Sequence, residues 1–240
     1  VAEVEEGYYY PAKGITKAEF LVMTMRVLGF QDDMLSDSSE QLFYDVEPGA
    51  YGANYISTAY RQGIIFGNGD GFFGAERNIT LHEGLSVLLR ALNYDVMADA
   101  NGGYPAGYIS TARSLGLLKG VKVDATGYLS RGTAAQILFH ALNTKPVLGV
   151  ILGGERLYSA PENLNLLEMV FGVHIAEGII DGNRFVSLPD GDGVRDGQIM
   201  IDRILYEIED EYEGKYLGYH TKAYYTDRND VRKIIYMDVS

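Results

Sequence analysis

Apolar residues recur at helical spacing in three stretches of the first 143 residues, and each stretch follows a hydroxyl side chain. These hydroxyl residues are Thr16, Thr80 and Ser130. A hydroxyl directly before an apolar-periodic run is typical of a helix N-cap, because it accepts a hydrogen bond from a free backbone N–H of the first turn. Glu19 and Glu83 stand three residues after the two threonines, which predicts capping boxes. The pattern therefore predicts three capped amphipathic helices.

A second element recurs at a fixed distance along the chain. Residues 55–67 read YISTAYRQGIIFG, and residues 108–120 read YISTARSLGLLKG. Repetition at a constant offset is typical of repeat proteins. Both segments predict helices that end at Gly63 and Gly116, since glycine adopts the left-handed C-cap conformation without the penalty of a Cβ atom.

These elements combine into a repeating unit of helix, glycine-rich loop and capped helix. The second unit spans residues 43–94 and the third spans residues 101–143. The first unit is incomplete, because residues 7–30 supply only the loop and the capped helix. We therefore expect residues 1–143 to form one helical domain.

The pattern changes after Thr144-Lys145-Pro146, where a short helix within residues 162–171 is followed by strand-like runs. Asp181-Gly182-Asn183 is expected to link the first two strands as a hairpin, and residues 227–230 the last two. We expect residues 144–240 to form a small antiparallel β-sheet or barrel, which makes the chain an α+β protein of two domains. The predicted strands are Val173–Ile180, Arg184–Leu188, Gln198–Ile201, Ile204–Ile208, Tyr219–Tyr225 and Arg232–Met237.

Charge and composition exclude several classes of function. The chain has 20 basic and 33 acidic residues, a net charge of −13, which disfavours nucleic acid as a partner. An anionic polymer would also be repelled unless a local group of cations received it. Cysteine is absent, so disulfides and thiolate chemistry are excluded. The longest apolar runs, such as Val147–Leu152, are far too short to span a bilayer.

No pattern of catalytic residues emerges. The histidines are scattered without metal-ligand spacing, and neither a Gly-x-Ser-x-Gly elbow nor a phosphate-binding loop is present. We expect a protein that is not an enzyme and that needs no cofactor. The histidines are His82, His140, His174 and His220.

The repeating unit resembles the S-layer homology repeat of bacterial surface proteins. That family's pattern runs Phe-x-Asp-Val, an aromatic residue, a helix ending in Gly-Ile-x-x-Gly, an Asp-Gly-x-Phe loop and Ile-Thr-Arg-Ala-Glu. The resemblance covers roughly residues 7–143. The matching residues are Phe43, Asp45, Val46, Tyr51, Gly63, Ile64, Ile65, Gly67, Asp70, Gly71 and Phe72 or Phe73, followed by Ile79, Thr80 and Glu83.

The resemblance implies a fold, a function and a location. The fold would be an all-α domain in which three repeats pack around a pseudo-threefold axis. The function would be non-covalent attachment to secondary cell-wall polysaccharide, often with pyruvylated sugars, in grooves between neighbouring repeats. The protein would then lie outside the cell, at the cell wall.

The resemblance also implies ligand contacts at the family's Thr-Arg-Ala-Glu arginine. An arginine suits an acidic sugar because its planar guanidinium can contact a carboxylate through two hydrogen bonds. The matching positions here are Lys17, Leu81 and Arg131. Since Leu81 is apolar, we expect at most two working grooves, with Lys17 and Arg131 as ligand contacts.

Four further residues are candidate ligand contacts, each with a structural alternative. Tyr51 and Tyr104 stand where the family has tryptophan, and a tyrosine ring can stack on a sugar or simply pack. Asp45 and Asp70 could accept hydrogen bonds from sugar hydroxyls or could cap turns. For Asp70 the turn is the favoured interpretation.

A cation site is a weaker hypothesis for the loop PDGDGVRDG. Asp190, Asp192 and Asp196 are carboxylates of the kind that calcium prefers. The spacing is not that of an EF-hand, and no glutamate follows at the required place. A glycine- and aspartate-rich turn is the favoured interpretation.

A second function from a different class remains open. The repeats could serve as a structural subunit of a surface array or filament, through self-association or contact with neighbouring surface subunits. Two observations favour it: two of the three arginine positions are altered, and the first repeat is incomplete. The apolar helix face within residues 15–30 needs a partner, either elsewhere in this chain or on another subunit.

Overall fold

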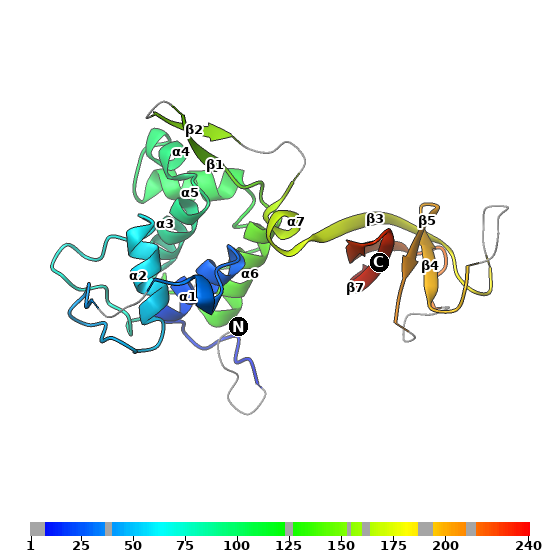
Figure 1. Ribbon diagram of the computed structural model, residues 1–240, viewed down its shortest axis with the longest axis horizontal. Helices are drawn as coiled ribbons and strands as arrows, with labels where there is room; N and C mark the ends of the chain where they lie inside the picture. The colour runs from blue at the N-terminus through cyan, green and yellow to red at the C-terminus, as the bar shows by residue number, and fades with distance from the viewer. Residues whose placement is uncertain are drawn as a thin grey trace. The chain divides into compact units, whose positions relative to one another are not determined.

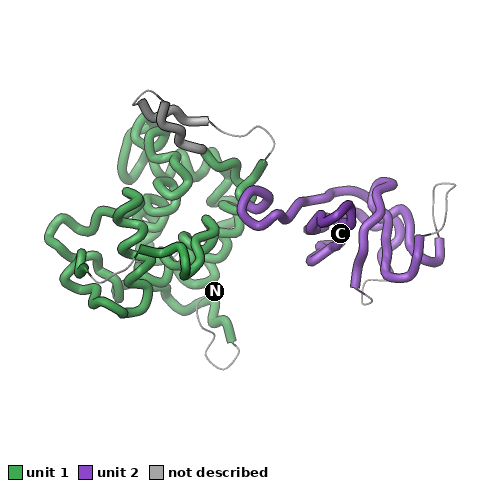
Figure 2. Tube along the Cα trace, viewed as in Figure 1, with its two compact units in different colours: residues 1–166 green, residues 167–240 purple. Residues whose placement is uncertain are grey.

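The computed structural model divides the chain into two compact units, residues 1–166 (unit 1) and residues 167–240 (unit 2), shown in Figure 2. The structure describes residues 8–36, 40–122, 127–152, 155–159, 164–186, 194–209 and 215–240. Unit 1 is mainly helical and unit 2 is mainly β, so the chain is a mixed α+β protein.

Unit 1 is built from short helices and ends in a β-hairpin (Figure 1). Strands β1 (Leu148–Leu152) and β2 (Glu155–Ser159) form the hairpin. The helices are α1 (Lys17–Val27), the 3₁₀ helix η1 (Asp32–Met34), α2 (Ala53–Arg61), α3 (Leu81–Ala91), α4 (Asp95–Ala100), α5 (Ala106–Ser114) and α6 (Arg131–Leu142).

The predicted helix starts are confirmed. Thr16 accepts a hydrogen bond from the backbone N–H of Glu19, and the Glu19 carboxylate accepts one from the backbone N–H of Thr16. Thr80 and Glu83 form the same capping box at the start of α3. Ser130 caps α6 through the backbone N–H of Thr133. Each cap satisfies a donor that a helix N-terminus otherwise leaves unpaired.

The predicted helix ends are confirmed as well. Gly63 follows α2 with φ 73° and Gly116 follows α5 with φ 74°. This is the left-handed region that favours glycine over any residue with a Cβ atom.

The residues just before the three caps form a closed ring of backbone hydrogen bonds. Ile15 N–H donates to Leu129 O (3.2 Å), Leu129 N–H to Ile79 O (2.9 Å), and Ile79 N–H to Ile15 O (3.1 Å). All three side chains are buried. The starts of α1, α3 and α6 therefore meet at one point, although they are far apart in the sequence.

The apolar face of α1 is covered within unit 1. Phe20, Leu21 and Met25 are fully buried, and α1 packs against α2, α3 and α6. The partner that the incomplete first repeat requires is therefore supplied by the other helices of the same chain.

Unit 2 is a closed five-stranded barrel, in the strand order β3-β4-β5-β7-β6. Strand β3 pairs with β6 from Val173 to Ile179 and with β4 at Ile180 and Gly182, and its register with β4 shifts between these last two residues. Among the described strands of the barrel, β5 and β7 pair in parallel and the other neighbours pair antiparallel. The elements are α7 (Leu166–Phe171), β3 (Val173–Gly182), β4 (Gln198–Ile201), β5 (Ile204–Glu207), β6 (His220–Arg228) and β7 (Val231–Val239).

One predicted strand is wrong. Residues 184–186 form a turn in which the Asn183 side chain accepts hydrogen bonds from the backbone N–H groups of Phe185 and Val186. An asparagine that bonds the backbone two residues on favours a turn over strand pairing. Strand β3 accordingly pairs with β4 and β6. Residues 187 and 188 of the predicted strand lie outside the described residues.

The predicted hairpin at residues 227–230 is confirmed. Strands β6 and β7 pair up to Arg228 and Val231, and the two residues between them, Asn229 and Asp230, have φ values of 53° and 64°. Two positive φ values are typical of the tight turn that matches strand twist.

Within the described part of the chain, no helix is both long and apolar enough to cross a membrane.

Candidate functional site

Lys17, the first residue of α1, is held against the loop that precedes α3. Its ammonium group donates to the Phe73 carbonyl oxygen (2.8 Å) and to Asn68 Oδ1 (3.4 Å), and lies 4.5 Å from the centre of the Phe73 ring. The residue is only 7% exposed. Burial, and then repulsion from Arg77, lowers the pKa of Lys17. Lys17 thus ties α1 to the loop of the second repeat.

Arg131, the first residue of α6, is held in the same way against the loop before α1. Its guanidinium lies 5.1 Å from the centre of the Tyr9 ring, and its backbone carbonyl accepts a hydrogen bond from the Tyr9 hydroxyl (2.8 Å). The residue is 5% exposed. Both predicted ligand cations therefore lie beside an aromatic ring from another repeat.

The third equivalent position, Leu81, has no charge to contribute. It is partly exposed, and its backbone N–H donates to Gly127 O (2.8 Å). Residues 123–126 of the neighbouring loop lie outside the described residues.

Both predicted aspartates accept hydrogen bonds from backbone N–H groups of the loop at residues 70–75. The Asp45 carboxylate accepts hydrogen bonds from the backbone N–H groups of Phe73 (2.7 Å), Gly74 (2.6 Å) and Ala75 (3.0 Å). Burial raises the pKa of Asp45, but the backbone N–H groups, led by that of Phe73, outweigh it and leave the pKa below its ordinary value. Asp70 accepts a hydrogen bond from the backbone N–H of Phe72, two residues on. Asp45 therefore fixes the shape of the loop against which Lys17 packs.

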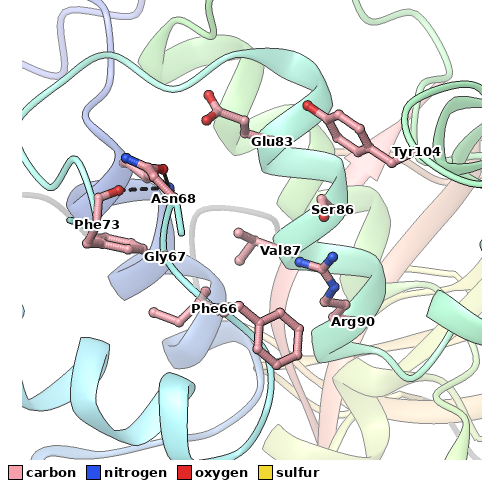
Figure 3. A pocket seen from close by; sticks show the side chains of 11 residues that line it. Phe66, Gly67, Asn68, Phe73, Glu83, Ser86, Val87, Arg90 and Tyr104 are labelled. Atoms are coloured by element: carbon pink, nitrogen blue, oxygen red, sulfur yellow. Dashed lines mark hydrogen bonds between the residues drawn. The ribbon is translucent and has the colours of Figure 1, made fainter. Parts of the chain in front are cut away.

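A pocket of about 240 Å³ lies in unit 1 beside Lys17, between the loop at residues 65–73, helix α3 and the segment before α5 (Figure 3). Such a volume is below the range of about 300–1,000 Å³ that is typical of small-molecule sites. Its lining combines apolar, aromatic, amide, hydroxyl and charged side chains. The lining residues are Lys17, Ile65, Phe66, Gly67, Asn68, Phe73, Glu83, Ser86, Val87, Arg90 and Tyr104.

Of the two predicted tyrosines, only Tyr104 lines this pocket. It is 57% exposed, and its ring contacts that of Tyr108 edge-on, with 6.1 Å between the centroids. Burial, and then the nearby Glu83 carboxylate, raises the pKa of Tyr104. Tyr51 occupies the equivalent position before α2 and is 54% exposed. Both rings present surface that a sugar could contact.

Glu83 lines the pocket but is engaged by other groups. Arg77 contacts both of its carboxylate oxygens, and the backbone N–H and hydroxyl of Thr80 also donate to it. Burial raises the pKa of Glu83, but Arg77 and Thr80 outweigh that effect and hold the pKa at about 2, against an ordinary value of 4.5. The negative charge of Glu83 is therefore compensated.

Arg90 is a charged pocket residue that the sequence patterns did not mark as a ligand contact. Its guanidinium lies between two aromatic rings, 5.1 Å from the centre of Phe66 and 5.8 Å from the centre of Tyr108. Phe66 is 62% exposed. A signal existed in the sequence, since Arg26 and Arg90 occupy the same position in two successive repeats. This repetition alone does not indicate a ligand contact, because an arginine near a helix C-terminus commonly interacts with the helix dipole.

No cation site is found in the described part of the chain, where no group of three carboxylates or histidines could hold a metal ion. Asp196 instead lies 3.7 Å from Arg184 as an exposed ion pair. Asp190 and Asp192 lie outside the described residues.

Comparison with known proteins gives a family match. Residues 42–83 match the model of the S-layer homology domain. The matched segment begins just before Phe43 and ends at Glu83, so it includes the Asp45 loop and the start of α3.

Similar proteins are bacterial, and the shared region is a small part of each. A "Cell surface protein" of Thermoanaerobacter kivui is 30% identical over 60% of this chain and 18% of its own length. A "Cellulosome-anchoring protein" of Acetivibrio thermocellus is 24% identical over 61% of this chain and 36% of its own length. An "Amylopullulanase" of Thermoanaerobacterium thermosulfurigenes is 39% identical over 35% of this chain and 4% of its own length.

Proposed function

Because this chain carries an S-layer homology domain at residues 42–83, we propose that unit 1 attaches it non-covalently to polysaccharide of a bacterial cell wall. The chain would then act outside the cell, at the wall, as a holding module and not as a catalyst. Relatives named as a cell surface protein and as a cellulosome-anchoring protein support this role.

The pocket beside Lys17 is the observation that carries the proposal. Its lining combines the exposed ring of Tyr104 with the amide of Asn68, the hydroxyl of Ser86 and the guanidinium of Arg90 (Figure 3). Sugar recognition needs this combination, since an aromatic face contacts the apolar side of a pyranose and polar groups fix its hydroxyls. Because the chain is acidic overall, a local cation is also needed to hold an acidic glycan.

The proposal includes a pseudo-threefold arrangement of the repeats. The cyclic hydrogen bonds among Ile15, Ile79 and Leu129 support it. A second set of bonds runs around the same ring in the opposite sense, from the backbone N–H groups of Lys17, Leu81 and Arg131 to the carbonyl oxygens of Arg77, Gly127 and Lys13, respectively. Such an arrangement would create one groove at each junction between neighbouring repeats.

The candidate contacts differ in how a sugar could reach them. Tyr104 is open to the pocket, and Tyr51 is open before α2. Lys17 and Arg131 stay predicted contacts. Each is nearly buried, so a ligand could touch only the small exposed part of the side chain. Asp45 and Asp70 also stay predicted contacts, although the three backbone bonds of Asp45 favour its role in the loop.

The test is sedimentation of the whole chain with purified wall sacculi, before and after the secondary polysaccharide is stripped with acid. We expect the chain to sediment with intact sacculi and to stay in solution with stripped ones. Failure to bind sacculi from several Gram-positive sources would refute the proposal. Contact between subunits would then be the alternative to test. The apolar face of α1 does not support that alternative, because other helices of unit 1 cover it.

A further inference from the structure

Two asparagines of unit 1 are each followed directly by a glycine. The pairs are Asn68-Gly69, in the loop before α3, and Asn101-Gly102, at the end of α4. All four residues are exposed. An asparagine before a glycine is chemically labile, because glycine has no side chain to shield its backbone nitrogen from the neighbouring side-chain amide. The chain therefore holds the same reactive pair in two structural settings.

The reaction open to such a pair is deamidation through a cyclic imide. The backbone nitrogen of the glycine forms a bond to the side-chain carbonyl carbon of the asparagine. The carbon–nitrogen bond of the side-chain amide breaks, and ammonia leaves with the proton of the attacking nitrogen. Water then opens the imide at either carbonyl, which gives aspartate or isoaspartate. Ring closure requires an accessible glycine nitrogen and a peptide plane that can rotate.

Hydrogen bonds restrain the pair Asn101-Gly102. The backbone N–H of Gly102 donates to Asp99 O (3.2 Å), so the attacking nitrogen is engaged. The side-chain amide of Asn101 donates to Thr111 Oγ1 (3.0 Å), which fixes the amide on α5. Asn101 is also the C-cap of α4, with φ −82° and ψ 12°. Ring closure at this pair would break both hydrogen bonds.

The pair Asn68-Gly69 is less restrained. The backbone N–H of Gly69 donates no hydrogen bond to any residue that the structure describes, and a Cβ atom added at Gly69 would have no neighbour within 4 Å. The backbone N–H of Asn68 donates to Phe72 O (2.9 Å), which closes the loop around the glycine without engaging it. The attacking nitrogen is therefore available, and the peptide plane before it has room to rotate.

Lys17 favours the reaction at Asn68. Its ammonium group donates to Asn68 Oδ1 (3.4 Å), the oxygen that gains negative charge when the side-chain carbonyl is attacked. A positive group beside that oxygen stabilises the developing charge. Within the described residues, the side-chain nitrogen of Asn68 donates no hydrogen bond that would hold it as the leaving group.

From these contrasts we propose that Asn68 is a site of spontaneous deamidation in the folded chain, and that the fold protects Asn101. The product places a carboxylate in the lining of the pocket, beside Lys17, where the encoded side chain is a neutral amide (Figure 3). The pocket of an aged chain then carries one more negative charge than that of a newly made chain. This inference concerns a covalent change of the chain itself and does not rest on the proposed attachment to polysaccharide.

The test is incubation of the whole chain for several days in mildly alkaline buffer at physiological temperature, followed by tryptic digestion and mass spectrometry. Replacement of NH by O raises the mass of the modified peptide, which distinguishes deamidation from isomerisation of Asp70 in the same peptide. Fragment ions assign the site. We expect Asn68 to react about tenfold faster than Asn101 or more, because each hydrogen bond that restrains Asn101 and Gly102 adds to the barrier.

Incubation in urea is the matched comparison, because it removes the fold and leaves both pairs intact. Asn68 and Asn101 should then react at similar rates. Equal rates in the native chain would overturn the proposal, and so would a native chain in which Asn68 does not react. A tenfold difference that persists in urea would overturn the protective role assigned to the fold.

Three variants complete the test. Asn68→Gln should abolish the mass gain at this position, because glutamine must close a larger ring that forms more slowly, and the control Asn101→Gln should leave the rate at Asn68 unchanged. Lys17→Met keeps the length of the side chain without its charge. It should slow the reaction at Asn68 about threefold, the order expected for a weak charge-assisted contact. An unchanged or faster rate in Lys17→Met would overturn the part assigned to Lys17. Far-UV circular dichroism verifies that each variant is folded.

Discussion

A single residue, Glu83, joins three features of the candidate site. It completes the capping box of α3 with Thr80, it pairs with Arg77 from the preceding loop, and it lines the pocket. Its negative charge is compensated by Arg77 and by the hydrogen bonds from Thr80, without any ligand. This compensation leaves the guanidinium of Arg90, on the same helix, as a positive group facing the pocket.

The depressed pKa of Glu83 predicts a pH dependence of stability. A carboxyl group with a folded pKa of about 2 and an ordinary value of 4.5 stabilises the folded state above the ordinary value, and this contribution is lost as the pH falls towards 2. Allowing for solvent screening of a partly exposed pair, the loss should be on the order of 1–2 kcal/mol between pH 5 and pH 2.

Urea denaturation of wild type and Glu83→Gln across this pH range measures that loss. The wild type should lose more stability than the variant on acidification. Glu76→Gln, which changes a neighbouring exposed carboxylate, is the control and should follow the wild type. Parallel curves for wild type and Glu83→Gln would show that the pairing with Arg77 contributes nothing to folding.

At the scale of elements, the packing of α4 against α5 departs from the regularity of the repeats. Helix α5 has Gly107 where the equivalent position of α2 has Asn54. A Cβ atom at Gly107 would collide with the backbone carbonyl oxygen of Ala98 in α4. The glycine is needed because the inserted helix α4, absent from the predicted repeat, lies directly against the first turn of α5.

We therefore expect Gly107→Ala to destabilise unit 1, although alanine is the better helix former. The cost should be about 2–3 kcal/mol, because a backbone carbonyl cannot rotate away as a side chain can. Ala106→Ser, at the exposed neighbouring position, should change stability by less than about 0.5 kcal/mol. Thermal or urea unfolding measures both changes in stability. A Gly107→Ala chain as stable as wild type would mean that α4 can move away at little cost.

At the scale of the whole molecule, every candidate ligand contact lies in unit 1, while the barrel has its own core. That core includes Ile180, Ile199 and Ile201 from β3 and β4, packed with Tyr206 and Met237. The strand order of the barrel assigns no activity to unit 2, because function depends on the groups of a site and not on the fold that carries them.

A core change in the barrel should therefore leave wall attachment intact. Ile201→Ala removes buried methyl groups and should lower the stability of unit 2 by about 2–4 kcal/mol. Sedimentation with sacculi should match the wild type at a temperature where the variant barrel stays folded. A loss of sedimentation there would mean that unit 2 contributes to attachment.

The sequence alone determined the elements whose causes are local. The caps at Thr16, Thr80 and Ser130 and the ends at Gly63 and Gly116 follow from chemistry within one helical turn. The same holds for the turn at residues 227–230. The predicted strand from Arg184 is wrong for a local reason too. The Asn183 side chain accepts hydrogen bonds from the backbone N–H groups of Phe185 and Val186, which favours a turn there. The repeated segments also pointed to the family, because their motifs lie in order along the chain.

Only the tertiary structure decided the candidate site. The roles of Lys17 and Arg131 depend on loops that approach them from other repeats, and the pocket exists because residues 65–73, α3 and Tyr104 converge. The surroundings of Arg90 depend on Phe66 and Tyr108, whose approach to it no local pattern predicts. Helix periodicity shows which face of a segment is apolar, but it does not show which distant side chain packs against that face, and this packing determines whether a charge is paired or available to a ligand.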